Sequence, residues 1–106
     1  MARKTTARIL RQDAKRLLAN VPEEYLFWCN DGRQLWNMKE LGEALASMTD
    51  ETFAYHSNAE KKDFSKWARE IIGDEKLARD LEKSLNRTQA AKKVADRIAF
   101  LSAKLA

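Results

Sequence analysis

The feature that most constrains the fold of this chain is a series of helix-start signals spaced along it. Each signal is an Asn or Ser followed three residues later by Glu or Gln, so that the two side chains can satisfy free N–H groups at a helix start. These signals lie at Asn37–Glu40, Ser57–Glu60 and Asn86–Gln89. Another helix restarts at Asp74, directly after Gly73, whose residue type favours the left-handed conformation of a helix end. A chain of 106 residues has the size of one domain, so the signals predict several short helices around a single core.

The apolar residues between these signals recur at spacings of three and four, as on the buried face of a helix. The pattern predicts helices over residues 6–19, 37–48, 58–72, 74–85 and 86–105, the first capped by Thr5 or Thr6 and ended before Pro22. The expected buried stripes are Leu10, Ala14 and Leu17; Met38, Leu41, Leu45 and Met48; Phe64, Trp67, Ala68 and Ile71; Leu77, Ala78, Leu81 and Leu85; and Ala91, Val94, Ala95, Ile98 and Leu105.

One stretch favours strands over helices. Residues 25–29 are dense in β-favouring types, and Asp31-Gly32 supplies the positive φ angles of a tight hairpin turn before a short return strand at residues 34–36. Both faces of the first strand are apolar, so we expect helices to cover both, although exposed aromatics here could also stack on single-stranded bases. Trp28 and Trp36 are the candidates for partial exposure. We therefore expect a mainly α fold, a compact bundle of about five helices with one two-stranded hairpin.

Charge is strongly segregated along the chain. The net charge is +4, but residues 1–20 carry a net charge of +5, residues 21–86 one of −5, and residues 87–106 one of +4. We interpret residues 1–106 as a single domain in which a basic N-terminal helix or arm, residues 1–20, precedes a compact module, residues 24–106. Basic ends around an acidic middle indicate either a surface for polyanions or self-association of ends with middles.

The leading functional hypothesis is a small non-enzymatic binding module that docks on nucleic acid or a ribonucleoprotein through its basic N-terminal helix. Several cations spaced three or four residues apart share one helix face, and phosphates would relieve their mutual repulsion. The alternatives are a solvated face and a protein-interaction or self-assembly domain, in which Leu10, Ala14, Leu17 and Leu18 pack on a partner. The candidate nucleic-acid-binding residues are Arg3, Lys4, Arg8, Arg11, Lys15, Arg16, Lys93 and Arg97. Phe100 lies off the apolar stripe beside the last of these and indicates a contact surface.

A second group of candidates surrounds the only histidine. His56 precedes the expected helix start at Ser57, and Asp63 could orient and charge its imidazole as an acid–base or ligand-binding pair. The alternative is a structural corner in which His56 satisfies buried backbone groups. The candidate set is His56, Asn58, Asp63 and Trp67. A single histidine without a nucleophile, paired metal ligands or a glycine-rich phosphate loop predicts no enzyme, metal or cofactor.

Sequence features also bear on the cellular setting. The chain has no apolar run long enough to span a membrane and no signal-peptide pattern, so we expect no membrane partner. The single cysteine, Cys29, cannot form an internal disulfide, and it lies in an apolar run that predicts a buried thiol. A reducing, cytoplasmic location is the corresponding expectation.

Residues 25–85 carry a combined pattern of motifs. It includes Asp31-Gly32, the run Asp50-Glu51-Thr52-Phe53, Tyr55-His56 with Asn58, Asp63-Phe64 with Trp67, and Gly73-Asp74 before Leu77-Ala78. This pattern resembles a family of small archaeal and bacterial domains of unknown function with a Tyr-His-x-Asn element followed by Asp-Phe and Trp. The resemblance implies a mostly helical intracellular module defined by His56, Asn58, Asp63 and Trp67, and it leaves the basic first and last helices outside.

Overall fold

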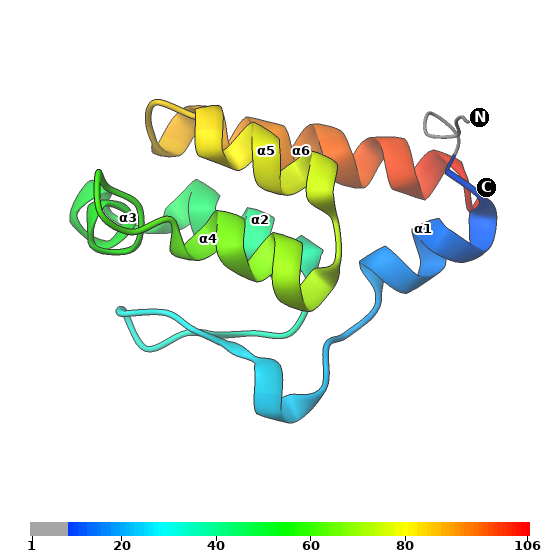
Figure 1. The fold of residues 1–106 in the computed structure, drawn as a ribbon, viewed down its shortest axis with the longest axis horizontal. Helices are drawn as coiled ribbons and strands as arrows, with labels where there is room; N and C mark the ends of the chain where they lie inside the picture. Colours follow the sequence, from blue (N-terminus) through cyan, green and yellow to red (C-terminus); the bar gives the residue numbers. More distant parts are fainter. Residues whose placement is uncertain (1–8) are drawn as a thin grey trace.

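The structure is a computed structural model that describes residues 9–106, and it is mainly α-helical with one small antiparallel hairpin. In chain order its elements are α1 (Arg11–Leu18), the 3-10 turn η1 (Glu23–Tyr25), β1 (Phe27–Trp28), β2 (Gln34–Leu35), α2 (Met38–Ser47), α3 (Asp50–His56), α4 (Asp63–Trp67), the π-helical turn η2 (Ala68–Ile72), α5 (Glu75–Lys83) and α6 (Arg87–Ala103). In Figure 1, α5 and α6 lie above α2 and α4, the hairpin lies below them, and α1 stands at the right beside the end of α6.

The packing of α2 on α6 forms the centre of the fold. Gly42 lies where these helices approach, because a Cβ on it would lie 3.1 Å from Cγ1 of Val94. Around this pair, one continuous cluster of buried apolar side chains includes residues of every helix except the short α3, and of the hairpin. Ala14 and Leu17 of α1 belong to it, at 0% and 4% exposure. The N-terminal helix is therefore built into the core by its apolar face. None of the helices within residues 9–106 combines the length and apolarity needed to cross a bilayer.

Three of the expected helix starts are confirmed. The side chains of Asn37, Asp74 and Asn86 each accept a hydrogen bond from the backbone N–H three residues later. Gly73, with φ +90°, ends η2 in the left-handed conformation that separates it from α5. These caps fix the boundaries of α2, α5 and α6 because they satisfy backbone groups that the helices themselves leave free.

The predicted capping box at Ser57 and Glu60 is wrong. Ser57 is the residue after α3, and the next helix begins at Asp63 rather than at residue 58. The intervening turn is held by Asn58, whose Oδ1 accepts the N–H groups of Glu60 and Lys61 at 2.9 and 3.0 Å. A short side chain that bonds to nearby backbone offers an alternative to helix formation, and here it replaces the predicted helix start.

The hairpin forms with a different turn and less cover than predicted. Cys29 and Arg33 close a three-residue loop in which only Gly32 has a positive φ, of +98°, while Asp31 does not. This is the geometry of a turn followed by a left-handed glycine bulge, so the predicted Asp-Gly turn is wrong in type. The two faces also differ, because Phe27 is 7% exposed and Trp28 is 67% exposed. Helices therefore cover one face only.

Several helix limits and buried faces also differ from the predictions. The described part of the first helix starts at Arg11, not at residue 6, and the expected Thr5 or Thr6 cap lies outside the described residues. Leu85 follows the end of α5 and is 85% exposed. On α6 the buried residues are Ala90, Val94, Arg97 and Leu101, whereas the expected Ala95 is exposed and Ala91 and Ile98 are half-buried. Leu105, expected on the same helix, follows its end and is half-buried.

Candidate nucleic-acid interface

The His56 corner joins the hairpin to the helices. The imidazole is 4% exposed, its Nδ1 lies 3.0 Å from Oδ2 of Asp63, and its Nε2 accepts the backbone N–H of Asn30 at 2.9 Å. Because Nε2 is an acceptor, the hydrogen-bond network assigns the ring proton to Nδ1, from which it is donated to the carboxylate. Both ring nitrogens are thus engaged, and the imidazole offers no free position to a substrate or metal ion.

The aromatic side chains around this histidine close the corner further. The ring of Phe27 lies 5.0 Å from the His56 ring and 5.6 Å from that of Trp67, between ring centroids. The indole N–H of Trp67 donates to the carbonyl oxygen of Tyr25 at 2.8 Å. Asn58, the remaining member of the set, donates to the carbonyl oxygen of Ala54 and holds the turn described above. The four residues thus lie in the α3–α4 region, where they dock the hairpin and shape the turn. This is the arrangement of a structural corner, the alternative to an acid–base or ligand-binding pair.

The predicted basic residues within the described chain divide into two groups. Arg11, Lys15 and Arg16 on α1 and Lys93 on α6 are exposed, whereas Arg97 is buried. Arg3, Lys4 and Arg8 lie outside the described residues.

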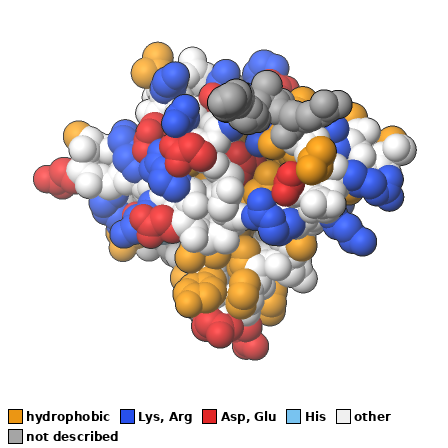
Figure 2. Space-filling view, turned by 45° about the vertical axis from the view of Figure 1, so that its right-hand side comes forward, with side chains coloured by type: hydrophobic (Ala, Val, Ile, Leu, Met, Phe, Trp, Pro, Cys, Tyr) orange, Lys and Arg blue, Asp and Glu red, His pale blue; other side chains and the backbone are white. Residues whose placement is uncertain are grey.

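The basic helix α1 meets the C-terminal segment in the fold. α1 packs against α6, and Nη1 of Arg11 donates to the carbonyl oxygen of Leu105 at 3.1 Å, across 94 positions of sequence. Lys104 and Lys15 are exposed on the same two segments. Figure 2 shows Lys and Arg side chains along the right-hand side of the molecule, the side on which α1 and the end of α6 meet, and mixed charges on the left. Folding therefore concentrates positive charge that the sequence places at opposite ends.

Arg97 is not part of this exposed surface. Its Nε and Nη2 donate to the two carboxylate oxygens of Asp74 at 2.7 and 3.1 Å, and these side chains are 8% and 1% exposed. Oδ1 of Asp74 also accepts the N–H of Leu77, which caps α5. A bidentate arginine–carboxylate pair of this kind has charge-assisted hydrogen bonds and a fixed geometry. The pair ties α6 to the start of α5.

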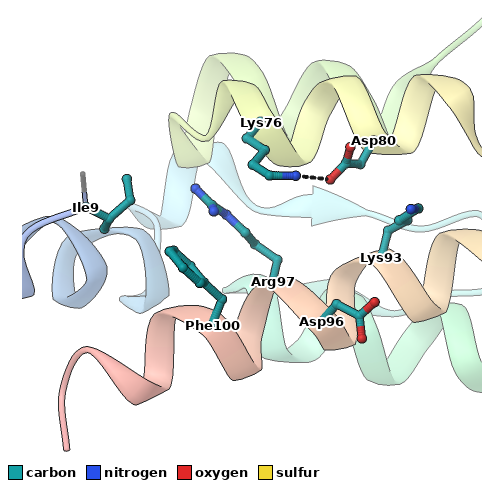
Figure 3. A pocket seen from close by; sticks show the side chains of 7 residues that line it. All are labelled: Ile9, Lys76, Asp80, Lys93, Asp96, Arg97 and Phe100. Carbon is teal, nitrogen blue, oxygen red and sulfur yellow. Dashed lines mark hydrogen bonds and ion pairs between the residues drawn. The ribbon is translucent and has the colours of Figure 1, made fainter. Parts of the chain in front are cut away.

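Arg97 borders a hollow with a volume of about 440 Å³. The hollow lies between Ile9, two residues before α1, and helices α5 and α6, as Figure 3 shows. Its lining combines an aromatic ring, an aliphatic side chain and charges of both signs. The lining residues are Ile9, Lys76, Asp80, Lys93, Asp96, Arg97 and Phe100.

A second surface feature lies at the hairpin. Trp28 and Tyr25 are 67% and 51% exposed, and a shallow hollow of about 280 Å³ lies against Trp28, Leu26 and Ile71. In Figure 2, hydrophobic side chains gather at the bottom of the molecule above a group of acidic ones. Exposed aromatics above a partly apolar hollow are typical of contact surfaces.

The hairpin turn itself contains two shifted ionisable groups. Burial raises the pKa of the Cys29 thiol, so this residue is a packed apolar group rather than a reactive thiolate. Burial also acts to raise the pKa of Asp31, but the backbone N–H of Arg33 and the Cys29 thiol donate to this carboxylate, and the net shift is downward. The Arg33 guanidinium, with Nε 3.2 Å from Oδ2, adds to that lowering. Through these contacts with Arg33 and Cys29, the Asp31 carboxylate stabilises the turn.

Residues 9–106 contain no group of three or more His, Cys, Asp or Glu side chains arranged to hold a metal ion. No protein-family model, curated protein or solved structure matches this chain. The resemblance to the Tyr-His-x-Asn family therefore stays a prediction.

The pairing of Arg97 with Asp74 and the hollow beside it were not predicted from the sequence. The sequence does contain a signal for the burial of Arg97. This residue lies three positions after Val94 and four before Leu101, on the apolar stripe of its helix. A charged residue on such a stripe indicates a buried partner. No sequence signal pointed to Ile9 and Lys76 as neighbours of this arginine, because they come from separate elements.

Proposed function

We propose that this protein is a nucleic-acid-binding module whose contact surface is formed jointly by α1 and the last turns of α6. The observation that carries the proposal is the packing of α1 against α6, which brings the exposed cations of α1, Arg11, Lys15 and Arg16, to the side of the fold where the exposed Lys104 follows α6. Several exposed Lys and Arg side chains on one side attract phosphates and release counterions when they bind. No base-reading motif accompanies them, so we expect salt-sensitive binding with little sequence preference.

Substitution of exposed cations tests this better than removal of residues 1–20. Ala14 and Leu17 belong to the core, so a truncation at residue 21 would unfold or destabilise the protein for reasons unrelated to binding. The test variant is Lys15→Gln with Arg16→Gln. The matched control is Lys39→Gln with Lys66→Gln, two exposed cations on α2 and α4.

The measurement is fluorescence anisotropy of labelled mixed-sequence DNA and RNA, single-stranded and duplex, across a salt series. We expect the α1 variant to bind more weakly, with a slope of log K against log salt that is smaller by about 1 for each phosphate that the variant no longer neutralises. The control variant should bind like the wild type. Equal effects of the two variants, or no binding by the wild type at low salt, would refute the proposal.

A second candidate function is a protein-interaction or self-assembly domain. Of the stripe first considered, Ala14 and Leu17 pack within the chain, whereas Leu10, expected to be buried, is 49% exposed. The observation that favours it is the exposure of Trp28, 67%, beside its shallow hollow. Sedimentation at high protein concentration tests the self-assembly form. Association that Trp28→Ala abolishes and Tyr55→Ala preserves would support it, whereas a constant monomer mass would exclude it.

A further inference from the structure

The hollow between Ile9, α5 and α6 contains an unused hydrogen-bond donor. Asp74 occupies Nε and Nη2 of Arg97, but Nη1 has no hydrogen-bond partner among the described residues. The side chain is only 8% exposed, and in Figure 3 it reaches from α6 across the hollow. A buried donor without a partner is costly, so an acceptor bound in the hollow would gain the full value of this hydrogen bond.

The charges around the hollow favour an anionic acceptor. Lys76 pairs with Asp80 at 2.8 Å, and Asp96 pairs with Lys92 at 3.2 Å, so each of these carboxylates is already balanced by a lysine. Lys93 has no ion pair within residues 9–106, and it lines the same hollow as Arg97. The hollow thus presents one unbalanced ammonium group and one free guanidinium NH2 group, Nη1, which suit a phosphate or carboxylate.

The wall beside these donors suits a flat ring. Phe100 is 42% exposed, and Cζ of Arg97 lies 5.3 Å from its ring centre. Ile9 adds an aliphatic surface to the hollow, and Nζ of Lys104, outside its lining, lies over the Phe100 ring at 5.0 Å from the ring centre. Nucleic-acid bases stack on aromatic rings and on arginine planes. A volume of about 440 Å³ also lies within the range of sites for small organic ligands.

We propose that this hollow binds one nucleotide unit of a single strand, with its base against Phe100 and its phosphate on Nη1 of Arg97 and on Lys93. The inference rests on the proposed function and adds to it a preference for single strands over duplexes. The exposed cations of α1 attract any nucleic acid, whereas the hollow accepts a base only from a strand whose bases are unpaired. A free mononucleotide carries the same chemical groups and is the other source that the experiment must distinguish.

The experiment compares four single variants in anisotropy titrations with a labelled single strand and with a duplex of the same sequence. Phe100→Leu keeps an apolar side chain but removes the stacking surface, and its control is Tyr55→Leu at another exposed aromatic. Lys93→Gln removes the phosphate contact, and its control is Lys92→Gln, the neighbour paired with Asp96. Circular dichroism verifies that all four variants fold.

We expect Phe100→Leu to weaken single-strand binding by about 10-fold, a value within the range for loss of one base stack, and to leave duplex binding unchanged. Lys93→Gln should weaken single-strand binding more than Lys92→Gln does. Two results would overturn the inference: Phe100→Leu weakens single-strand and duplex binding equally, or Phe100→Leu and Tyr55→Leu weaken single-strand binding equally. In either case, duplex binding by the wild type would still support the proposed function. Absence of all nucleic-acid binding by the wild type would refute both.

Titration with adenosine monophosphate, followed by NMR chemical shifts, separates the two sources. Two results together would support binding of the nucleotide unit of a strand in the hollow. Adenosine monophosphate should shift the NMR signals of Phe100 and Lys93, and Phe100→Leu should weaken single-strand binding. Shifts with adenosine monophosphate but no effect of Phe100→Leu on strand binding would overturn the strand assignment in favour of a free nucleotide.

Discussion

The buried pair of Arg97 and Asp74 yields the sharpest prediction about stability. Removal of one partner of such a pair costs about 3–5 kcal/mol, because the other charge stays buried without compensation. Asp74→Asn retains an oxygen that can cap α5 but removes the negative charge, and Arg97→Met fills similar space without the positive charge. A domain of this size has a free energy of unfolding of about 5–15 kcal/mol, so each single variant should lose a large part of it.

The double variant Asp74→Asn/Arg97→Met should recover most of that loss. Neither charge is then left alone, and replacement of a buried ion pair by neutral groups is often neutral or stabilising. The double variant should therefore lose less than either single variant, which corresponds to a coupling free energy of about 3 kcal/mol or more in the double-mutant cycle.

Urea unfolding, followed by circular dichroism at 222 nm, measures the cycle. With a slope of about 1–3 kcal/mol/M, the midpoint of each single variant should fall by about 2 M. A control pair at the exposed ion pair of Lys92 and Asp96 should show coupling below about 0.5 kcal/mol. If the losses at Asp74 and Arg97 simply add in the double variant, the two side chains do not compensate each other and the reasoning is refuted.

Three further predictions concern stability. His56→Ala should lower the free energy of unfolding by about 2–4 kcal/mol, from a cavity and an unpaired hairpin N–H; a loss below about 0.5 kcal/mol in urea unfolding would contradict the structural role. Gly73→Ala should cost about 1–2 kcal/mol in the same assay because an L-residue is strained at its positive φ, and an unchanged midpoint would be inconsistent with that conformation. The Arg69 guanidinium lowers the pKa of Glu75 and Glu82 below the ordinary value of a glutamate, so these pairs stabilise the fold above the unfolded-state pKa and lose that effect as the pH falls through the folded-state values. Urea midpoints of wild type and Arg69→Gln should therefore converge at low pH, and a constant difference from neutral to strongly acidic pH would argue against the shift.

The fold class followed from local signals. The caps at Asn37, Asp74 and Asn86 and the glycine at residue 73 act on backbone groups within one turn, so a sequence pattern is sufficient to locate them. The prediction failed at Ser57 because two local solutions competed there. A serine cap and an asparagine turn satisfy the same kind of backbone group, and the sequence carries both.

The candidate site was harder to predict, because its features depend on side chains from separate elements. The basic character of both ends could be read from the sequence, but not that they lie side by side. Arg97 was assigned to the basic surface by its charge, whereas its position on the apolar stripe of α6 decides its burial against Asp74. The exposure of Trp28 likewise depends on which hairpin face the helices leave open.

The hydrogen bond between Arg11 and Leu105 can form only after both segments have been synthesised. The two residues are 94 positions apart, and chains grow by about 5–20 residues per second, so α1 leaves the ribosome roughly 5–20 s before the segment on which it packs. Through that interval its apolar face can reach α2 but not α6. The basic helix is thus made well before the segment that follows α6, and its packing is complete only after that segment has been made.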